Sequence, residues 1–381
     1  MPINLTLAHL QTPCLILDEE RMVRNITRLR AHLNGLGVPL RPHLKTAKSV
    51  EVAKYLVDEQ QNSATVSTLK EAEIFAEAGI KNILYAVGIA PHKLVRIAAL
   101  RAKGADIIVI LDNLEQAKAI TDFAKIINDR IPVLIEIDCD GHRSGIAPDN
   151  AETIIAIGKA LTDGGAELRG VLTHAGKSYT SRNKAELEMY AEQERAAVVK
   201  AATTLREAGL PCPVVSVGSS PTAHFARNLD GVTEVRAGVF VFFDLVMAGI
   251  GVCSVDDIAL SVLATVIGHQ KDKGWILVDA GWMAMSRDRG TSRQTVDMGY
   301  GVVCDAKGKP YADLIMIDAN QEHGILAIQP NSNAKLPELE VGDLVRILPN
   351  HACASGAQHD HYNVINKQQQ VVAKWSRFSG W

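Results

Sequence analysis

The chain has 381 residues, which is too long for one small hydrophobic core, so a large domain followed by a smaller one is expected. Its hydrophobic fraction of 47% and charged fraction of 22% are typical of a globular protein in water, and a net charge of -3 argues against nucleic-acid binding, which needs a basic surplus. The long apolar stretch at residues 235–252 contains Arg236 and Asp244, so no membrane span is predicted.

The cysteines and the first residues indicate the compartment. Six cysteines are spread along the chain without a Cys-x-x-Cys pair, which predicts reduced thiols rather than a disulfide framework. The sequence starts without the basic segment and apolar core of a secretory signal. A cytoplasmic protein is therefore expected.

The first elements of the chain are a short apolar strand at residues 14–17 and a helical pattern at residues 19–33. Eight β-rich runs then alternate with helical stretches: the run ending near residue 40, then 64–68, 83–87, 107–111, 133–138, 169–174, 214–218 and 234–239. Apolar strands that alternate with helices predict a parallel sheet covered on both faces, and eight such units favour a (β/α)8 barrel in an α/β protein. An open doubly wound sheet is the alternative, although no dinucleotide glycine fingerprint follows the first strand.

From about residue 252 the pattern changes. Strand-like runs separated by turns replace the helical periodicity, at residues 261–269, 275–280, 325–328 and 344–348. We therefore expect a barrel at residues 19–251 and a β domain at residues 252–381, which the strand within residues 1–18 would join.

The octapeptide at residues 41–48 closes a barrel strand just before a helix. Side chains that do chemistry collect at the carboxyl ends of parallel strands. A lysine in a partly desolvated barrel mouth would have a lowered pKa and could form a Schiff base with a carbonyl compound, which makes Lys45 a candidate. The alternative is that Lys45 and Lys48 are solvated charges in a turn.

Two further strand ends offer groups that could bind a phosphate. Small and hydroxyl residues fill residues 216–222, and Arg236-Ala237-Gly238 would lie beside them. Backbone N–H groups at such positions hold phosphates in many barrels, but a plain glycine turn is the alternative. Arg143 follows the fifth strand and could equally lie on the surface, and His174 and Tyr179 follow the sixth.

A candidate metal pair lies near the C-terminus, where His351 and Cys353 are two residues apart. If residues 351–353 are extended, both side chains point the same way, and an imidazole with a thiolate favours zinc. Water or substrate would complete the coordination. The alternative is a buried cysteine beside a packed histidine. His359 and His361 have the same spacing but lie in a polar run, so we expect them at the surface or rim.

These motifs together resemble a known family. Residues 41–48, 217–222, 236–238, 279–281 and 349–353 follow the order found in fold-type III pyridoxal-phosphate (PLP) enzymes, specifically the D-serine dehydratase and D-threonine aldolase group. The resemblance covers nearly the whole chain. It implies an alanine-racemase-like barrel with a C-terminal β domain, and a homodimer.

The resemblance also implies a role for each candidate residue. Lys45 would hold PLP covalently, and His351 and Cys353 would bind a divalent metal such as zinc, manganese, magnesium or cobalt. The remaining cofactor contacts are the phosphate cup of Gly218, Ser219 and Gly238, and the surroundings of the pyridine ring, Arg143, His174 and Tyr179. Aldolases of the group carry Asp where Cys353 stands, which favours a dehydratase.

The implied activity is elimination of the β-hydroxyl of a D-3-hydroxy amino acid, with ammonia as one product. D-threo-3-hydroxyaspartate would give oxaloacetate, and D-serine would give pyruvate. Arg287 or Arg289 could bind the second carboxylate of hydroxyaspartate. One alternative is an aldolase that releases glycine and an aldehyde. Another is a PLP-binding protein without turnover, against which the β domain and the metal pair argue.

Overall fold

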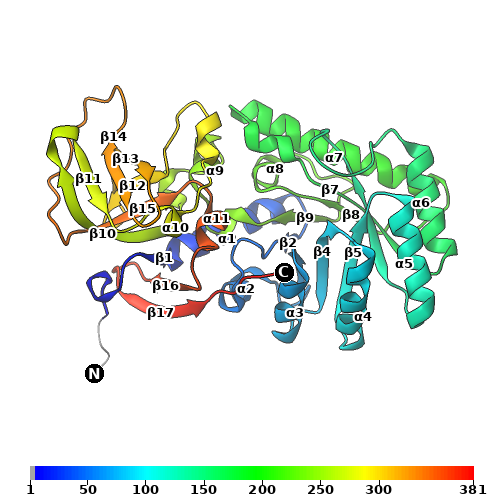
Figure 1. Ribbon diagram of the computed structural model, residues 1–381. Helices are drawn as coiled ribbons and strands as arrows, with labels where there is room; N and C mark the ends of the chain where they lie inside the picture. Colours follow the sequence, from blue (N-terminus) through cyan, green and yellow to red (C-terminus); the bar gives the residue numbers. More distant parts are fainter. Residues whose placement is uncertain (1–4) are drawn as a thin grey trace. The chain divides into compact units, whose positions relative to one another are not determined.

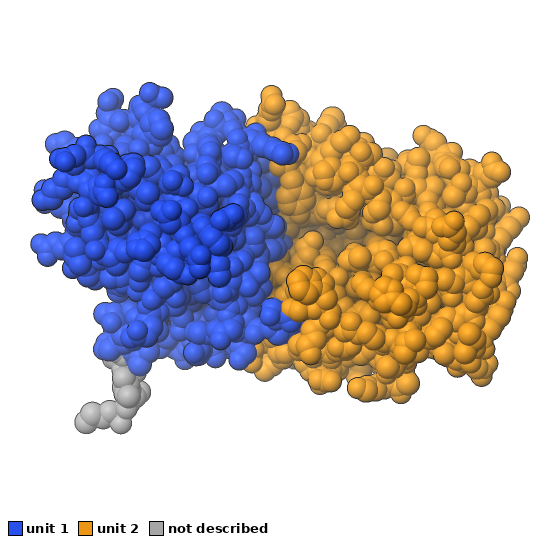
Figure 2. Space-filling model, viewed as in Figure 1, with its two compact units in different colours: residues 1–27, 239–379 blue, residues 28–238, 380–381 orange. Residues whose placement is uncertain are grey.

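The computed structural model describes residues 5–381, which divide into two compact units. One unit consists of residues 28–238 with residues 380–381, and the other of residues 5–27 with residues 239–379 (Figure 2). Helix α1, Glu19–Gly35, passes from one unit to the other.

Residues 28–238 form a nearly closed barrel of eight parallel strands with helices around it (Figure 1). The strand order is β2-β9-β8-β7-β6-β5-β4-β3, and a bridge between His43 and Thr65 links the first and last strands. The strands are β2 Leu40–Pro42, β3 Ser63–Val66, β4 Asn82–Gly88, β5 Asp106–Leu111, β6 Pro132–Ile137, β7 Glu167–Thr173, β8 Val214–Val217 and β9 Glu234–Ala237. The barrel prediction is confirmed, and the doubly wound alternative is wrong.

The barrel helices follow from local sequence signals. Thr68, Asn113, Asn150, Asn183 and Ser219 each cap a helix by accepting a hydrogen bond from the backbone N–H three residues on. The strands are rich in buried Val, Ile and Leu because helices and the barrel interior cover both of their faces. The helices are α2 Val50–Leu56, α3 Leu69–Glu77, α4 Leu94–Ala102, α5 Leu114–Ile127, α6 Ala151–Asp163, α7 Lys184–Glu207 and α8 Ser220–Phe225.

The other unit contains a nine-stranded sheet in the order β11-β14-β13-β12-β15-β10-β1-β16-β17. Strand β1, Cys14–Asp18, pairs antiparallel with β10 and parallel with β16, so the N-terminal strand lies within this sheet (Figure 1). The other strands are β10 Leu260–Gln270, β11 Trp275–Val278, β12 Gly301–Asp305, β13 Pro310–Ala319, β14 Gly324–Ile328, β15 Leu344–Pro349, β16 His361–Ile365 and β17 Val371–Ser376; the short helices are α9 Leu245–Gly249, α10 Trp282–Met285 and α11 Ala352–Gly356.

Strands β12, β13, β16 and β17 were not predicted. Strand β17 alternates between half-buried and exposed residues, and three of the first four residues of β13 are polar or Pro, so neither reads as an apolar run.

Across residues 5–381, no helix is both long and apolar enough to cross a membrane. Cys14, Cys139, Cys212 and Cys304 are buried thiols outside any disulfide.

Candidate active site

Two lysines follow β2 at the carboxyl end of the barrel, and they differ in their partners. Lys48 Nζ lies 3.3 Å from Glu71 Oε1, whose side chain is fully buried at the start of α3. Lys45 is exposed, and its amine makes no hydrogen bond or ion pair within residues 5–381. Lys48 therefore belongs to a structural ion pair, whereas the Lys45 amine is available for chemistry.

Two histidines near Lys45 are held in the neutral form. Desolvation, followed by the charge of Lys45, lowers the pKa of His43 well below its usual value. Desolvation also lowers the pKa of His174 to about 3, although the hydrogen bond to the Gly218 carbonyl opposes the shift. His174 Nδ1 lies 2.5 Å from Gly218 O, and a carbonyl can only accept. Nδ1 therefore carries the hydrogen, and Nε2 is left as an acceptor.

Buried Arg236 adds a guanidinium to this group. It donates to Ser216 Oγ at 2.7 Å and to Thr173 O at 2.5 Å, at the ends of β8 and β7. Desolvation lowers its pKa, and the carboxylates of Glu234 and Glu194 oppose the shift. Together with Lys45, Arg236 makes this end of the barrel suited to an anionic ligand.

Arg143 and Tyr179 approach His174 from two loops. The positive charge of Arg143 helps to lower the His174 pKa, and Arg143 Nη2 lies 3.8 Å from Glu136 Oε1. The Tyr179 and His174 rings have centroids 6.1 Å apart at an interplanar angle of 46°. The side chains expected around a pyridine ring are therefore gathered near the free amine of Lys45.

Two glycines allow neighbouring segments to approach closely. A Cβ on Gly218 would lie 2.1 Å from Arg236 O, and a Cβ on Gly238 would lie 3.1 Å from His43 O. Ser219 begins α8 by accepting the Thr222 N–H, and its hydroxyl is buried. A cradle without Cβ atoms beside buried hydroxyl and cationic groups fits the phosphate and ring of PLP.

Glu194, on α7, was not predicted as part of the site. Its Oε1 accepts the N–H groups of Ala175 at 2.9 Å and Gly218 at 3.0 Å, and its Oε2 accepts the Thr222 hydroxyl at 2.6 Å. The side chain is only 1% exposed, and burial raises its pKa despite these hydrogen bonds. Glu194 thus joins the loop after β7, which contains His174, to the loop after β8.

The candidate metal pair lies in the other unit, just after β15. His351 has extended backbone, but Cys353 lies in α11, so residues 351–353 do not form the extended segment considered above. The buried carboxylate of Asp244 explains the difference, because its Oδ2 accepts the Ala352 N–H at 3.0 Å and stabilises the first turn of α11. His351 and Cys353 still contact each other through a side-chain hydrogen bond.

His351 has a carboxylate partner that was not predicted. Its Nδ1 lies 2.7 Å from Asp288 Oδ2, and because a carboxylate accepts, Nδ1 donates. Desolvation lowers the pKa of His351, but the bonds to Asp288 and Cys353 outweigh it and raise the pKa to about 11. Because Nδ1 donates to Asp288, the second nitrogen, Nε2, is the one that can bind a metal once it has released its proton.

The donor set fits a metal with two protein ligands. An imidazole and a thiolate suit zinc and related divalent ions. In the described part of the chain, no cluster of three or more His, Cys, Asp or Glu side chains is arranged to hold a metal. His359 is half-buried, with Nε2 at 3.0 Å from Ala284 O, and His361 is paired with Asp360. Neither histidine adds a third ligand to His351 and Cys353.

The two arginines proposed for the substrate differ in their surroundings. Arg289 Nη2 lies 2.8 Å from Asp297 Oδ2, and its guanidinium also lies over the Tyr300 ring. Arg287 is exposed, with its guanidinium 4.0 Å from the Trp282 ring centroid. Within residues 5–381 it makes no hydrogen bond or ion pair. Arg287 is therefore the better candidate for binding a carboxylate.

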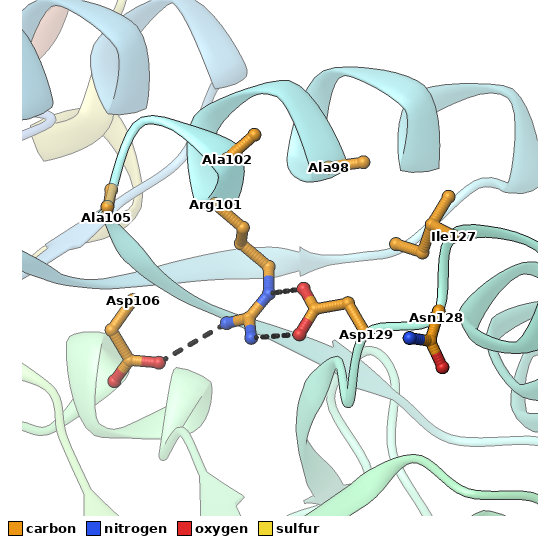
Figure 3. Close-up of a pocket in the computed structure, with 9 residues that line it drawn as sticks. Ala98, Arg101, Ala102, Ala105, Asp106, Ile127, Asn128 and Asp129 are labelled. Carbon is orange, nitrogen blue, oxygen red and sulfur yellow. Dashed lines mark hydrogen bonds and ion pairs between the residues drawn. The ribbon is translucent and has the colours of Figure 1, made fainter.

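A surface pocket of about 580 Å³ lies at the amino ends of β5 and β6, between the ends of α4 and α5. Figure 3 shows Arg101 bound to Asp129 through two hydrogen bonds and directed also at Asp106. Since these charges already pair with each other and the pocket is at the opposite strand ends from Lys45, it is not part of the candidate site.

Comparison with known proteins matches two family models. Residues 17–246 match the alanine racemase N-terminal domain, and residues 259–365 match a putative serine dehydratase domain. The chain is 54% identical over 381 residues to D-threo-3-hydroxyaspartate dehydratase of Delftia sp. (strain HT23), with 99% of each chain covered.

A more distant relative and a solved structure also match nearly the whole chain. A 3-hydroxy-D-aspartate aldolase of Paracoccus denitrificans (strain Pd 1222) is 30% identical, with 96% of this chain and 91% of the relative covered. The structure of a D-threo-3-hydroxyaspartate dehydratase C353A mutant in the metal-free form has a TM-score of 0.95 and 53% identity, and covers 99% of this chain and 100% of its own.

Proposed function

Because the chain belongs to the family that joins an alanine racemase N-terminal domain to a serine dehydratase domain, we propose that it is a PLP- and divalent-metal-dependent dehydratase. The proposed substrate is D-threo-3-hydroxyaspartate, which loses water across the Cα–Cβ bond and is then hydrolysed to oxaloacetate and ammonia. The full-length identity of 54% to a dehydratase of this substrate supports the choice. D-serine would give pyruvate and ammonia by the same elimination.

The exposed amine of Lys45 supports this function most directly. It makes no ion pair within the described residues, whereas nearby Lys48 is bound to Glu71. A lysine amine can both hold a carbonyl cofactor and act as a base. The lowered pKa values of His43 and His174 make both rings weak bases, which favours Lys45 as the group that takes the α-proton.

When bound, PLP supplies an electron sink for the charge at Cα, and a divalent metal supplies a Lewis acid for the departing hydroxyl. The chain's residues position these groups. Gly218, Ser219 and Gly238 would receive the phosphate, and His174 would offer a flat neutral ring to the pyridine. His351 and Cys353 would hold the metal.

The overall reaction can be tested with purified protein and D-threo-3-hydroxyaspartate. We expect ammonia and oxaloacetate in equal amounts, a fall in rate of about tenfold or more after EDTA treatment, and recovery with added zinc or manganese. Glycine and glyoxylate as products would instead identify an aldolase. Absence of product from a panel of D-β-hydroxy amino acids, despite bound PLP, would identify a cofactor-binding protein without turnover.

We assign the second carboxylate of the substrate to Arg287. Its guanidinium lies over the Trp282 ring and makes no hydrogen bond within the described residues, so its N–H groups are available for a bidentate carboxylate contact. Arg287→Ala should lower kcat/KM for D-threo-3-hydroxyaspartate by roughly 10- to 100-fold and change D-serine turnover little, since a hydrogen bond to a charged group contributes about 1.5–3 kcal/mol. Steady-state kinetics with both substrates measures this difference.

Arg289→Ala is the matched control for Arg287→Ala. Arg289 lies in the same loop, but its guanidinium is already paired with Asp297. Arg289→Ala should lower the turnover of both substrates to the same extent, because loss of the pair with Asp297 would disorder the loop. Equal losses for the two substrates in Arg287→Ala would contradict the assignment.

We further propose that the protein is a cytoplasmic homodimer. The resemblance to the dehydratase and aldolase group supports the dimer. The buried thiols of Cys14, Cys139 and Cys304, with pKa values raised to about 12 by burial, are those of a protein that keeps its cysteines reduced. Sedimentation equilibrium of the purified protein measures the oligomeric state, and a monomer would contradict the dimer.

A further inference from the structure

We propose that Asp288 is the residue that positions His351 for metal binding. The proposal rests on the proposed function, in which His351 and Cys353 hold a divalent metal. Asp288 is not itself a metal ligand in this scheme. It acts through the hydrogen bond from His351 Nδ1 to Asp288 Oδ2, which is 2.7 Å long.

This hydrogen bond holds the neutral imidazole in the tautomer that can bind a metal. Because Asp288 can only accept, the hydrogen of the neutral ring stays on Nδ1, and the lone pair is on Nε2. Metal-binding histidines commonly donate their second N–H to a carboxylate in this way, which orients the ring and makes it a stronger ligand. The 41% exposed side chain of His351 would otherwise be able to rotate.

The backbone around Asp288 is itself anchored to the segment that contains His351. Asn350, which is 2% exposed, donates from Nδ2 to Gly299 O at 2.7 Å and to Asp288 O at 3.3 Å, and accepts the Thr291 hydroxyl at 3.1 Å. The Asp288 N–H also donates to Ser286 Oγ at 3.2 Å. These hydrogen bonds join the two backbone segments and so keep the Asp288 carboxylate beside the His351 imidazole.

Ser286, two residues before Asp288, has a φ of 75°. A positive φ is uncommon for a residue other than glycine, and such conformations are found at sites where the chain must place a group accurately. Two residues further on, Asp288 is hydrogen-bonded to Asn350 and His351, which directly follow β15. The local conformation is thus consistent with a positioning role for Asp288.

The same unit contains a second pair of the same kind, which provides a control. Asp360 contacts His361 Nδ1, but the two residues are adjacent in sequence and the Asp360 side chain is 89% exposed, against 35% for Asp288. His361 is not one of the residues proposed to bind a metal. A carboxylate-to-imidazole contact is therefore present in both pairs, and only the Asp288 pair should affect metal binding.

The test compares zinc affinity in the wild type, Asp288→Asn, Asp288→Ala and Asp360→Asn, measured by competition with a chromophoric chelator. Asp288→Asn keeps an acceptor but removes the charge, and Asp288→Ala removes both. We expect zinc affinity to fall in that order, by about 10-fold and then up to about 100-fold. Asp360→Asn should match the wild type.

Two further measurements separate positioning from a general loss of structure. The visible spectrum of the Co²⁺-loaded protein should change in the Asp288 variants, because the ligand His351 is altered. The absorbance of bound PLP and the thermal midpoint should stay close to those of the wild type.

If both Asp288 variants bind zinc with wild-type affinity and keep the Co²⁺ spectrum unchanged, the inference is wrong, but the proposed function is unaffected. An equal loss in Asp360→Asn would also overturn it, since the effect would not be specific to His351. If the wild type itself binds neither zinc nor Co²⁺, the inference fails together with the metal-dependent part of the proposed function.

Discussion

Lys45→Ala should abolish the reaction almost completely, with a fall in kcat/KM of roughly 10³-fold or more, because in the proposed mechanism Lys45 both attaches the cofactor and acts as the base. The exposed Lys45 amine makes no ion pair in the described part of the chain, so its loss leaves no buried carboxylate unpaired. The thermal midpoint should therefore change little. Measurement of rate, PLP absorbance and melting in parallel checks all three expectations.

Lys48→Ala is the matched control, since this lysine lies three residues further along the same loop. Lys48→Ala should lower the thermal midpoint and leave most of the activity, because Lys48 pairs with the buried Glu71 carboxylate at 3.3 Å. Loss of the pair should cost about 2 kcal/mol of stability, as expected when a buried acceptor loses a charged partner. Partial recovery of Lys45→Ala by added ethylamine would support the role of the amine. A similar loss of activity in both variants would count against the assignment of Lys45.

The barrel was predictable because its strands are read from runs of buried apolar residues. Strand β6, for example, is buried along its whole length, and its sequence is almost entirely apolar. The β domain was predictable only in part. Strand β17 alternates between half-buried and exposed residues, and its sequence, Val371–Ser376, contains Lys374 near the middle, so pairing with β16 decides its conformation.

The residues expected to act on cofactor or metal could be proposed from the sequence because they lie in short motifs or at strand ends. The residues that support them were not. Glu194 lies in the middle of a long helix, where a glutamate ordinarily faces water, and only the tertiary fold buries it against Gly218. Asp288 lay between the two arginines that were noted, but its contact with His351 spans 63 residues of sequence. Hydrogen bonds between distant segments have no local signature.

Substitution of Glu194 should therefore lower the stability of the protein strongly, although no sequence pattern pointed to this residue. It accepts three hydrogen bonds, from Ala175, Gly218 and Thr222, inside a region almost closed to water. Glu194→Ala leaves two buried N–H groups without an acceptor, and each such group costs about 1–3 kcal/mol. We expect a loss of about 3–5 kcal/mol in the free energy of unfolding, measured by denaturant titration, which is in the range of exceptional single substitutions.

The same change should weaken cofactor binding, because Glu194 sets the distance between the loops after β7 and β8. His174 reaches the Gly218 carbonyl across these loops at 2.5 Å, so movement of either loop displaces the ring that would pack on the cofactor. PLP titration of Glu194→Ala should show an affinity lower by about tenfold or more, as a loss of 1.4 kcal/mol would give.

Glu194→Gln separates the charge from the hydrogen bonds. Its amide oxygen can still accept from Ala175 and Gly218, and its NH₂ group can donate to the Thr222 hydroxyl, which is able to accept. This variant should keep most of the stability and PLP affinity that Glu194→Ala loses. If Gln is as damaging as Ala, the negative charge near Arg236 is what matters, and the explanation based on loop spacing is wrong.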